Sequence, residues 1–212
     1  MSETVVIQTP QPAADRLVIV FHGVGSSAAN MAPFAKYLAA EFPTAFVVSV
    51  NSPHRSEHGQ GWQWFSVLGV TETNRRERVD AAMPRFRAEV AHWQQAAGVD
   101  ASKTALVGFS QGAIMSLESA VANPDAPGRI AAQVVSMAGR FVAPPAAITP
   151  GVSIHLLHGQ LDRVIPVQHT VQSAAHLAAL GVTVTSDLSP SAAHEIDAEL
   201  AAQAVARLKP VR

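Results

Sequence analysis

The sequence predicts an α/β protein built on a mainly parallel central sheet of about seven strands, with helices on both faces. Short apolar runs alternate with segments of helical periodicity along almost the whole chain of 212 residues, which is the pattern of successive βαβ units. Most of these runs are apolar throughout, as is typical of strands covered on both faces. Ligands bind beyond the carboxyl ends of the strands in such sheets, so functional residues are expected there.

Strands and helices alternate in the first half of the chain. Apolar runs predict strands at 4–8, 17–21 and 45–50. Pro10 closes the first of them. Residues 29–40 and 79–97 place apolar side chains at helical spacing, and Gly98 ends the second of these helices.

The second half of the chain continues the same alternation. Apolar runs predict four more strands, at 104–107, 133–138, 153–157 and 182–188. Helical spacing predicts helices at 113–122, 167–180 and 195–208. Residues 141–150 are rich in proline and alanine and form a connection, and Gly181 closes the helix before the last strand.

Residues 51–78 interrupt this pattern. They contain prolines, glycines, several charges and the aromatic residues Trp62, Trp64 and Phe65, without a clear period. A long irregular stretch inside a compact domain is usually functional or a surface excursion. We therefore expect a single domain over residues 1–212, with 51–78 lying near the substrate site.

Composition excludes several classes of function. Hydrophobic residues make up 48% of the chain and charged residues 15%, and the net charge of −1 favours neither nucleic acid nor anionic lipid. The absence of cysteine excludes disulfides and a thiol nucleophile. Residues 1–9 lack the features of a signal peptide, and the apolar stretch 130–148 is interrupted by polar residues and prolines. We expect a soluble, cytoplasmic protein without stable membrane insertion; the oligomeric state is open, and a homodimer is one option.

A serine lies where the predicted strand 104–107 meets the predicted helix 113–122. The connecting residues are Gly108-Phe109-Ser110-Gln111-Gly112. A strand that turns into a helix through Gly-x-Ser-x-Gly is the nucleophile elbow of serine hydrolases. The pattern alone is weak, and its place between a strand and a helix strengthens the prediction that Ser110 is a nucleophile.

A serine nucleophile needs a histidine base and a carboxylate that orients the base. Asp162 follows the strand 153–157, and His194 follows the last strand, so the chain supplies Ser, Asp and His in the order of the hydrolase fold. Asp187 and Asp197 are rivals for the acid. The first lies near the end of the last strand and the second within the predicted closing helix, so neither leaves a plausible loop between the acid and His194.

Other histidines have structural interpretations. His22 and His158 end predicted strands and could brace loops through hydrogen bonds. His54 and His58 have a spacing that could hold a metal on a helix, but no helix and no third ligand are predicted there. We therefore predict no metal and no cofactor.

Backbone N–H groups are expected to bind the negative oxygen of the reaction intermediate. Gln111 follows the nucleophile and should supply one donor, and Val24 in the loop after the strand 17–21 should supply the other. Because these donors are backbone groups, replacing the Gln111 or Val24 side chain should do less harm than losing Ser110.

Aromatic residues in the irregular stretch are candidates for an apolar acyl site. They are Trp62, Trp64, Phe65 and the nearby Leu68. The alternative interpretation, given equal weight, is that these side chains simply attach the irregular stretch to the core.

Four stretches of the chain together match the motifs of one family. They are Phe21-His22-Gly23-Val24-Gly25, Gly108-Phe109-Ser110-Gln111-Gly112, His158-Gly159 with Asp162 and Val164-Ile165-Pro166, and Ala193-His194-Glu195-Ile196. With them the chain resembles, over nearly its whole length, the carboxylesterase, phospholipase and acyl-protein thioesterase family of α/β hydrolases. The segment Gln63-Trp64-Phe65-Ser66-Val67, with residues 75–80, looks like a small bacterial esterase branch of that family.

The resemblance implies the α/β-hydrolase fold and ester cleavage. The family's nucleophile, acid and base map onto Ser110, Asp162 and His194, the residues already reached from chemistry. The chain departs from the family pattern at Ser26 and Ala113, where aspartate and glycine are frequent. In the family the region of the aromatic cluster lines the acyl groove, and Ser66 replaces its usual acidic neighbour. That difference concerns the substrate.

The sequence thus predicts a serine esterase that cleaves small carboxylic esters through an acyl-enzyme. Its partner is a small-molecule ester. The alternatives are a thioesterase or lysophospholipase, or a peptidase, with the same three side chains. A non-catalytic binding protein of the same fold is a further alternative. The physiological substrate, the acyl length and the alcohol are not predicted.

Overall fold

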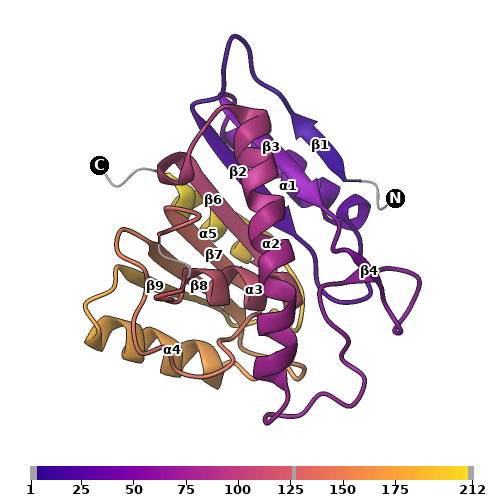
Figure 1. Ribbon diagram of the computed structural model, residues 1–212, viewed down its shortest axis with the longest axis vertical. Helices are drawn as coiled ribbons and strands as arrows, with labels where there is room; N and C mark the ends of the chain where they lie inside the picture. The colour runs from indigo at the N-terminus through magenta and orange to yellow at the C-terminus, as the bar shows by residue number, and fades with distance from the viewer. Residues whose placement is uncertain (1–3, 126–127, 210–212) are drawn as a thin grey trace.

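A twisted seven-stranded sheet runs through the molecule (Figure 1). The computed structural model describes residues 4–125 and 128–209. The strand order is β1-β3-β2-β6-β7-β8-β9, and every neighbouring pair is parallel except β1 and β3. The strands are β1 (Val5–Gln8), β2 (Arg16–Phe21), β3 (Ala45–Val50), β6 (Thr104–Phe109), β7 (Gln133–Met137), β8 (Ser153–Gly159) and β9 (Val184–Ser189). The predicted α/β class, with its mainly parallel seven-stranded sheet, is confirmed.

Helices cover both faces of the sheet. They are α1 (Ala28–Glu41), α2 (Arg75–Ala97), α3 (Gln111–Ala120), α4 (Gln168–Ala179) and α5 (Ala198–Leu208), with a short 3₁₀ turn at Ala101–Lys103. In Figure 1, α2, α3 and α4 lie in front of the sheet, and α1 and α5 lie behind it. This is the two-faced covering that the continuous apolar runs predict.

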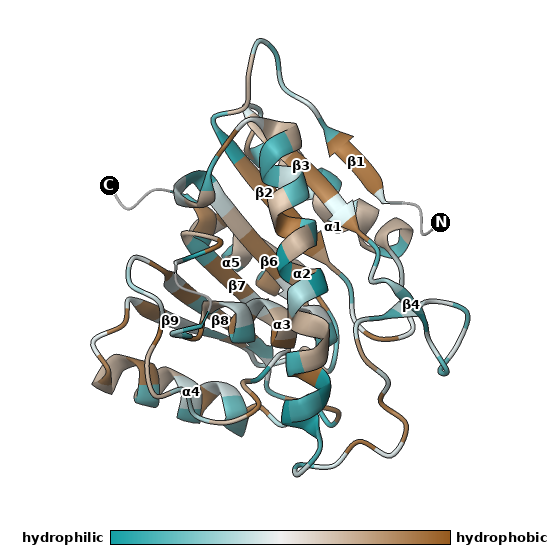
Figure 2. Ribbon diagram, viewed as in Figure 1, coloured by the Kyte–Doolittle hydropathy of each residue, from teal (hydrophilic) through white to brown (hydrophobic). Residues whose placement is uncertain are grey.

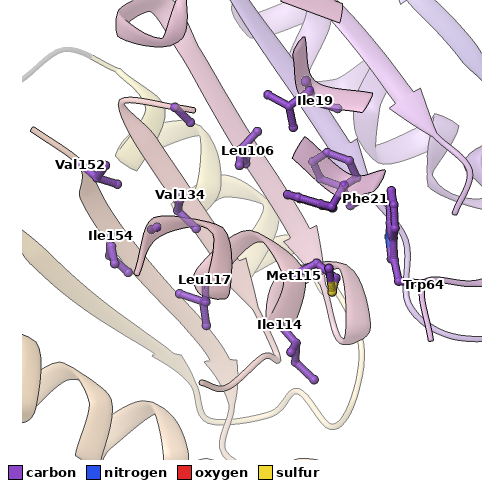
Figure 3. Packing of buried hydrophobic residues seen from close by; sticks show 14 of the residues in the cluster. Ile19, Phe21, Trp64, Leu106, Ile114, Met115, Leu117, Val134, Val152 and Ile154 are labelled. Carbon is purple, nitrogen blue, oxygen red and sulfur yellow. The ribbon is translucent and has the colours of Figure 1, made fainter. Parts of the chain in front are cut away.

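The alternating side chains of β2 show how the two layers share the sheet. Leu17, Ile19 and Phe21 point into the core under α2 and α3, whereas Val18 and Val20 point into the core under α1 and α5. All five are 0% exposed. Figure 2 shows the resulting brown, hydrophobic interior strands, and Figure 3 shows the packing on the α2 and α3 face. Each such side chain contributes about 1.5–3 kcal/mol on burial.

Helix caps account for one difference from the predicted boundaries. The structure begins α5 at Ala198, whereas the spacing predicts a start at 195. The Asp197 carboxylate accepts a hydrogen bond from the N–H of Leu200 at 2.7 Å, so Asp197 is the N-cap and the preceding residues belong to a loop. This lengthens the loop that carries His194.

The irregular stretch 51–78 has more structure than its sequence predicts. β4 (His54–Arg55) pairs with β5 (Trp62–Gln63) as a small antiparallel ribbon, and α2 already begins at Arg75. Trp64 is 2% exposed and packs edge-on against Phe86, with ring centroids 5.0 Å apart. The middle of this stretch is therefore fixed to the core.

No helix within residues 4–125 and 128–209 combines the length and the apolar character that crossing a bilayer requires.

Buried histidine makes the stability of the fold depend on pH. His155 on β8 is 7% exposed, and its Nδ1 lies 2.8 Å from the Thr185 hydroxyl. Burial, with a smaller effect of Arg207, lowers the pKa of His155 from 6.5 to about 4. Between these two pH values the unfolded chain binds a proton that the folded chain does not, so the free energy of unfolding falls as the pH falls.

We predict that His155→Gln weakens this pH dependence. Glutamine can still pair with Thr185 but does not ionise. Between pH 6.5 and 4, the slope of the free energy of unfolding against pH should decrease by up to about 1.4 kcal/mol per pH unit. Urea unfolding at a series of pH values measures this slope. An unchanged slope would show that His155 is not a source of the acid sensitivity.

Candidate active site

Ser110 lies at the carboxyl end of β6, immediately before α3, in a strained backbone conformation. Its φ of +52° and ψ of −114° are ordinarily adopted by glycine. The turn is sharp enough that α3 presses against β2: a Cβ on Gly112 would lie 2.5 Å from the carbonyl oxygen of Phe21. The second glycine of the motif is therefore required by this close approach.

The three predicted side chains form one hydrogen-bonded chain. His194 Nε2 lies 3.0 Å from Ser110 Oγ, and His194 Nδ1 lies 2.7 Å from Asp162 Oδ2. A carboxylate only accepts hydrogen bonds, so Nδ1 carries the proton and Nε2 is left to accept one from the serine hydroxyl. Ser110 and Asp162 are each 7% exposed, and the His194 side chain is 19% exposed.

Asp162 is held by donors on both carboxylate oxygens. Oδ1 accepts from the N–H groups of Val164 and Ile165 at 2.8 and 2.9 Å. Oδ2 accepts from His194 and from His158 Nε2, the latter at 3.1 Å. Burial would raise the pKa of Asp162, but the hydrogen bonds from His194, Ile165 and Val164 outweigh it and hold the pKa below its usual value. The carboxylate is thus ionised and fixed in orientation.

His158 braces the loop that carries Asp162, as its place at the end of a predicted strand suggests. Its Nε2 faces two acceptors, Asp162 Oδ2 and the carbonyl oxygen of Ile165 at 2.8 Å, so Nε2 carries a proton. Its Nδ1 then accepts from the Thr170 hydroxyl at 2.8 Å. Burial lowers the pKa of His158, which keeps it neutral in this role.

The rival carboxylates have other partners. Asp187 forms an ion pair with Arg207 on α5. Asp197 caps α5 and also accepts from the Ser189 hydroxyl at 2.7 Å. The carboxylate hydrogen-bonded to His194 is that of Asp162.

The two predicted oxyanion donors belong to segments that adjoin Ser110. Gln111 is the first residue of α3, where an N–H group has no acceptor within its own helix. Val24 follows Gly23, and a Cβ on Gly23 would lie 3.0 Å from the Cβ of Ser110. The loop is held in place by Gly25 N–H, which donates to the Trp62 carbonyl at 3.0 Å. The oxyanion role of Val24 and Gln111 stays a prediction.

The Gln111 side chain has a structural task that the sequence does not reveal. Its Oε1 accepts from the N–H of Trp64 at 2.7 Å, and its Nε2 donates to the carbonyl oxygen of Phe65 at 2.8 Å. Both bonds are buried. Gln111 therefore ties the irregular stretch to the first turn of α3.

The predicted acyl-site residues have different environments. Trp64 and Phe65 are 2% and 8% exposed and belong to the core on the α2 and α3 face. Trp62 lies on β5, and the guanidinium carbon of Arg55 lies over the Trp62 ring, 4.0 Å from the ring centroid. Leu68 is 52% exposed. Trp64 and Phe65 therefore pack in the core, as the alternative interpretation of the sequence holds. Contact of any of the four residues with substrate stays a prediction.

An apolar groove of about 530 Å³ opens beside His194, between the beginnings of α1 and α5. Its lining includes Phe34 and Tyr37 from α1, Phe109 from the end of β6, and Ile196 from the loop before α5. The sequence places Phe34 only on the apolar face of a helix. Nothing in it shows that this face continues past the core to the histidine loop.

Comparison with known proteins shows the family of the chain. Residues 2–209 match the model of the phospholipase/carboxylesterase family, so the chain belongs to that family of α/β hydrolases. It is a hydrolase of the esterase type.

Among its relatives is the esterase YpfH of Escherichia coli (strain K12), 43% identical over 192 residues, which cover 91% of this chain and 81% of that protein. Among solved structures, esterase PE8 superposes with a TM-score of 0.86 at 27% identity, over 97% of this chain and 95% of that one. Acyl-protein thioesterase 2 of Zea mays has a TM-score of 0.71 at 19% identity, over 99% and 100% of the two chains, which shows the shared fold.

We predict that Gln111→Ala destabilises the protein. The change leaves the Trp64 N–H and the Phe65 carbonyl without their buried partner, at a cost of about 2–5 kcal/mol in total. Urea unfolding measures the loss. Gln95→Ala, at an exposed site on α2, is the matched control and should change stability by less than about 0.5 kcal/mol. Equal effects of the two variants would contradict the buried tie.

We also predict that glycine is more stable than alanine at position 110. Alanine keeps the strained backbone conformation of the wild-type residue. Glycine adopts this conformation without the strain, which removes a cost of about 1–3 kcal/mol from the folded state, but it also makes the unfolded chain more flexible, which offsets part of the gain. The free energy of unfolding of Ser110→Gly should therefore be about 1 kcal/mol higher than that of Ser110→Ala. The reverse order in denaturant titrations would show that the turn is not strained.

Proposed function

We propose that this protein is a serine carboxylesterase that hydrolyses small carboxylic esters through an acyl-enzyme. The observation that carries the proposal is the hydrogen-bonded chain from Ser110 through His194 to Asp162. It supplies a nucleophile, a base in the tautomer that accepts the serine proton, and an ionised acid that stabilises the charged base. Membership of an esterase family supports the reaction class.

In the first step Ser110 Oγ attacks the ester carbonyl carbon while His194 Nε2 takes its proton. The carbonyl oxygen gains a negative charge, which the N–H groups of Val24 and Gln111 stabilise. The proton on Nε2 then passes to the alcohol oxygen as the carbon–oxygen bond breaks, and the acyl group stays on Ser110.

In the second step water replaces the alcohol. His194 removes a proton from the water, the resulting nucleophile attacks the acyl carbon, and the acid leaves as Ser110 regains its proton. Asp162 keeps the imidazole oriented throughout, because its own position is fixed by four hydrogen bonds. None of these steps requires a cofactor or a metal.

An ester is favoured over an amide or a thioester by the family relatives named esterase. The thioesterase among the structural neighbours is 19% identical and carries no substrate argument. Relative kcat/KM values on matched ester, thioester and amide substrates with one acyl group separate these activities. Dominant amide cleavage would overturn the substrate class.

We predict that Ser110→Ala abolishes hydrolysis of nitrophenyl esters, with a loss of at least about 10⁴-fold in kcat, without unfolding the protein. A fluorophosphonate should label wild-type protein at Ser110, as peptide mass spectrometry reports. The matched control is Ser191→Ala, which removes an exposed hydroxyl from the loop that leads to His194 and should retain both turnover and labelling. Turnover by Ser110→Ala at the wild-type rate would place the nucleophile elsewhere.

A further inference from the structure

The groove beside His194 is formed by one face of α1 and the beginning of α5. The wall from α1 begins at Asn30. Pro33, Phe34 and Tyr37 follow it at three, four and seven residues, so all four lie on one side of the helix. At 1.5 Å per residue this wall is about 10 Å long. The facing wall includes Ile196, Ala198 and Ala201.

The groove adjoins the candidate active site through His194. His194 and Phe109 both line it, and their rings are 5.0 Å apart between centroids. The same imidazole directs its Nε2 at Ser110 Oγ. The groove and the Ser110 hydroxyl therefore meet at the His194 side chain.

The position of the base indicates which half of an ester the groove receives. In the proposed reaction the alcohol oxygen must come within hydrogen-bond distance of His194 Nε2 to collect its proton. The alcohol therefore departs on the side of Ser110 that His194 occupies. Trp64 and Phe65, tied to the Gln111 side chain, belong to the core on the opposite face of the sheet.

The lining also indicates the chemistry of that alcohol. Most of the lining side chains are apolar: Met31, Pro33, Phe34, Tyr37, Phe109, Ile196, Ala198 and Ala201. The charged ones are Glu195, which is exposed at the rim, and Asp197, whose carboxylate is committed to capping α5. Since the described residues of this lining include carboxylates and neither lysine nor arginine, an anionic leaving group would be repelled.

We propose that the groove between α1 and α5 is the alcohol subsite, and that it selects esters of uncharged apolar alcohols such as benzyl or hexyl alcohol over esters of small or anionic alcohols. The inference rests on the proposed esterase function. A volume of about 530 Å³ lies within the range of small-molecule sites and accommodates either group. Glycerophosphoryl leaving groups, as in lysophospholipids, are disfavoured by the same charges.

The test compares acetate esters that differ only in the alcohol. Ala201→Phe fills the groove, and Ala202→Phe, the matched control, makes the same change at the next, exposed residue of α5. Ala201→Phe should lower kcat/KM for hexyl and benzyl acetate by about tenfold or more, mainly through KM, and change methyl acetate less than about twofold. Ala202→Phe should change none of them.

Two further arms keep the test decisive. Phe34→Ala removes one wall, and it should lower kcat/KM for hexyl acetate without affecting methyl acetate, whether or not Ala201→Phe folds. For the wild-type enzyme, kcat/KM for hexyl acetate should be at least about tenfold higher than kcat/KM for the analogue that carries a carboxylate at the far end of the hexyl chain.

The outcomes separate this inference from the proposed function. Equal losses on methyl, hexyl and benzyl acetate, or a loss that instead follows acyl length in a series of methyl esters, would overturn the alcohol subsite while leaving the esterase proposal intact. Absence of a fluorophosphonate adduct at Ser110 in folded wild-type protein would remove the esterase proposal, and the subsite with it.

Discussion

The sharp turn from β6 into α3 is the constraint on which the site depends. It holds Ser110 at φ +52° at the carboxyl end of the central strand β6. It can do so because α3 packs directly against the backbone of β2. A Cβ on Gly108 would collide with the backbone of Gly112, and one on Gly112 would collide with β2. Local strain is maintained by the packed layers around it: Ser110 N–H donates to the Met137 carbonyl at 2.9 Å, and its carbonyl accepts from Ile114 at 3.0 Å. The serine is thus placed by the backbone before its side chain meets any partner.

The other two side chains reach Ser110 because two loops are joined to each other. Gln160 N–H donates to the Ser189 carbonyl at 2.9 Å, and Leu161 N–H donates to the Ala192 carbonyl at 3.0 Å. These bonds extend the parallel pairing of β8 and β9 into the loops that carry Asp162 and His194. Asp162 gains its remaining donors locally, from the backbone of its own loop and from His158. The orientation of Asp162 is therefore set at the end of β8, and the orientation of His194 follows from it.

The sequence predicts most of the fold because apolar runs report burial directly. It predicts the hydrogen-bonded trio for a different reason: serine, carboxylate and histidine each follow a strand, and parallel strands bring their carboxyl ends to one edge. What it misses depends on the particular partner that a side chain finds, whether that partner is near in the sequence or distant. The tie from Gln111 to Trp64 and Phe65, the brace from His158 to Asp162 and the start of α5 at Ala198 are each set by a partner that periodicity does not reveal.

Prediction of a binding surface is harder than prediction of the trio, and α1 shows the physical reason. In the sequence, the apolar residues of α1 form a single stripe that is expected to face the core. In the structure Met31 and Leu38 are buried, whereas Tyr37 is 41% exposed and lines the groove together with Phe34. The same residue types serve the core and the groove, and only the position of α5 decides where one ends and the other begins. Because Asp197 delays the start of α5, the residues just before it remain in a loop and line the groove beside His194. A single capping interaction thus shapes the space next to the base. The chemistry of the trio is held by backbone pairing, whereas the shape of the groove depends on a few side chains that can change without disturbing it.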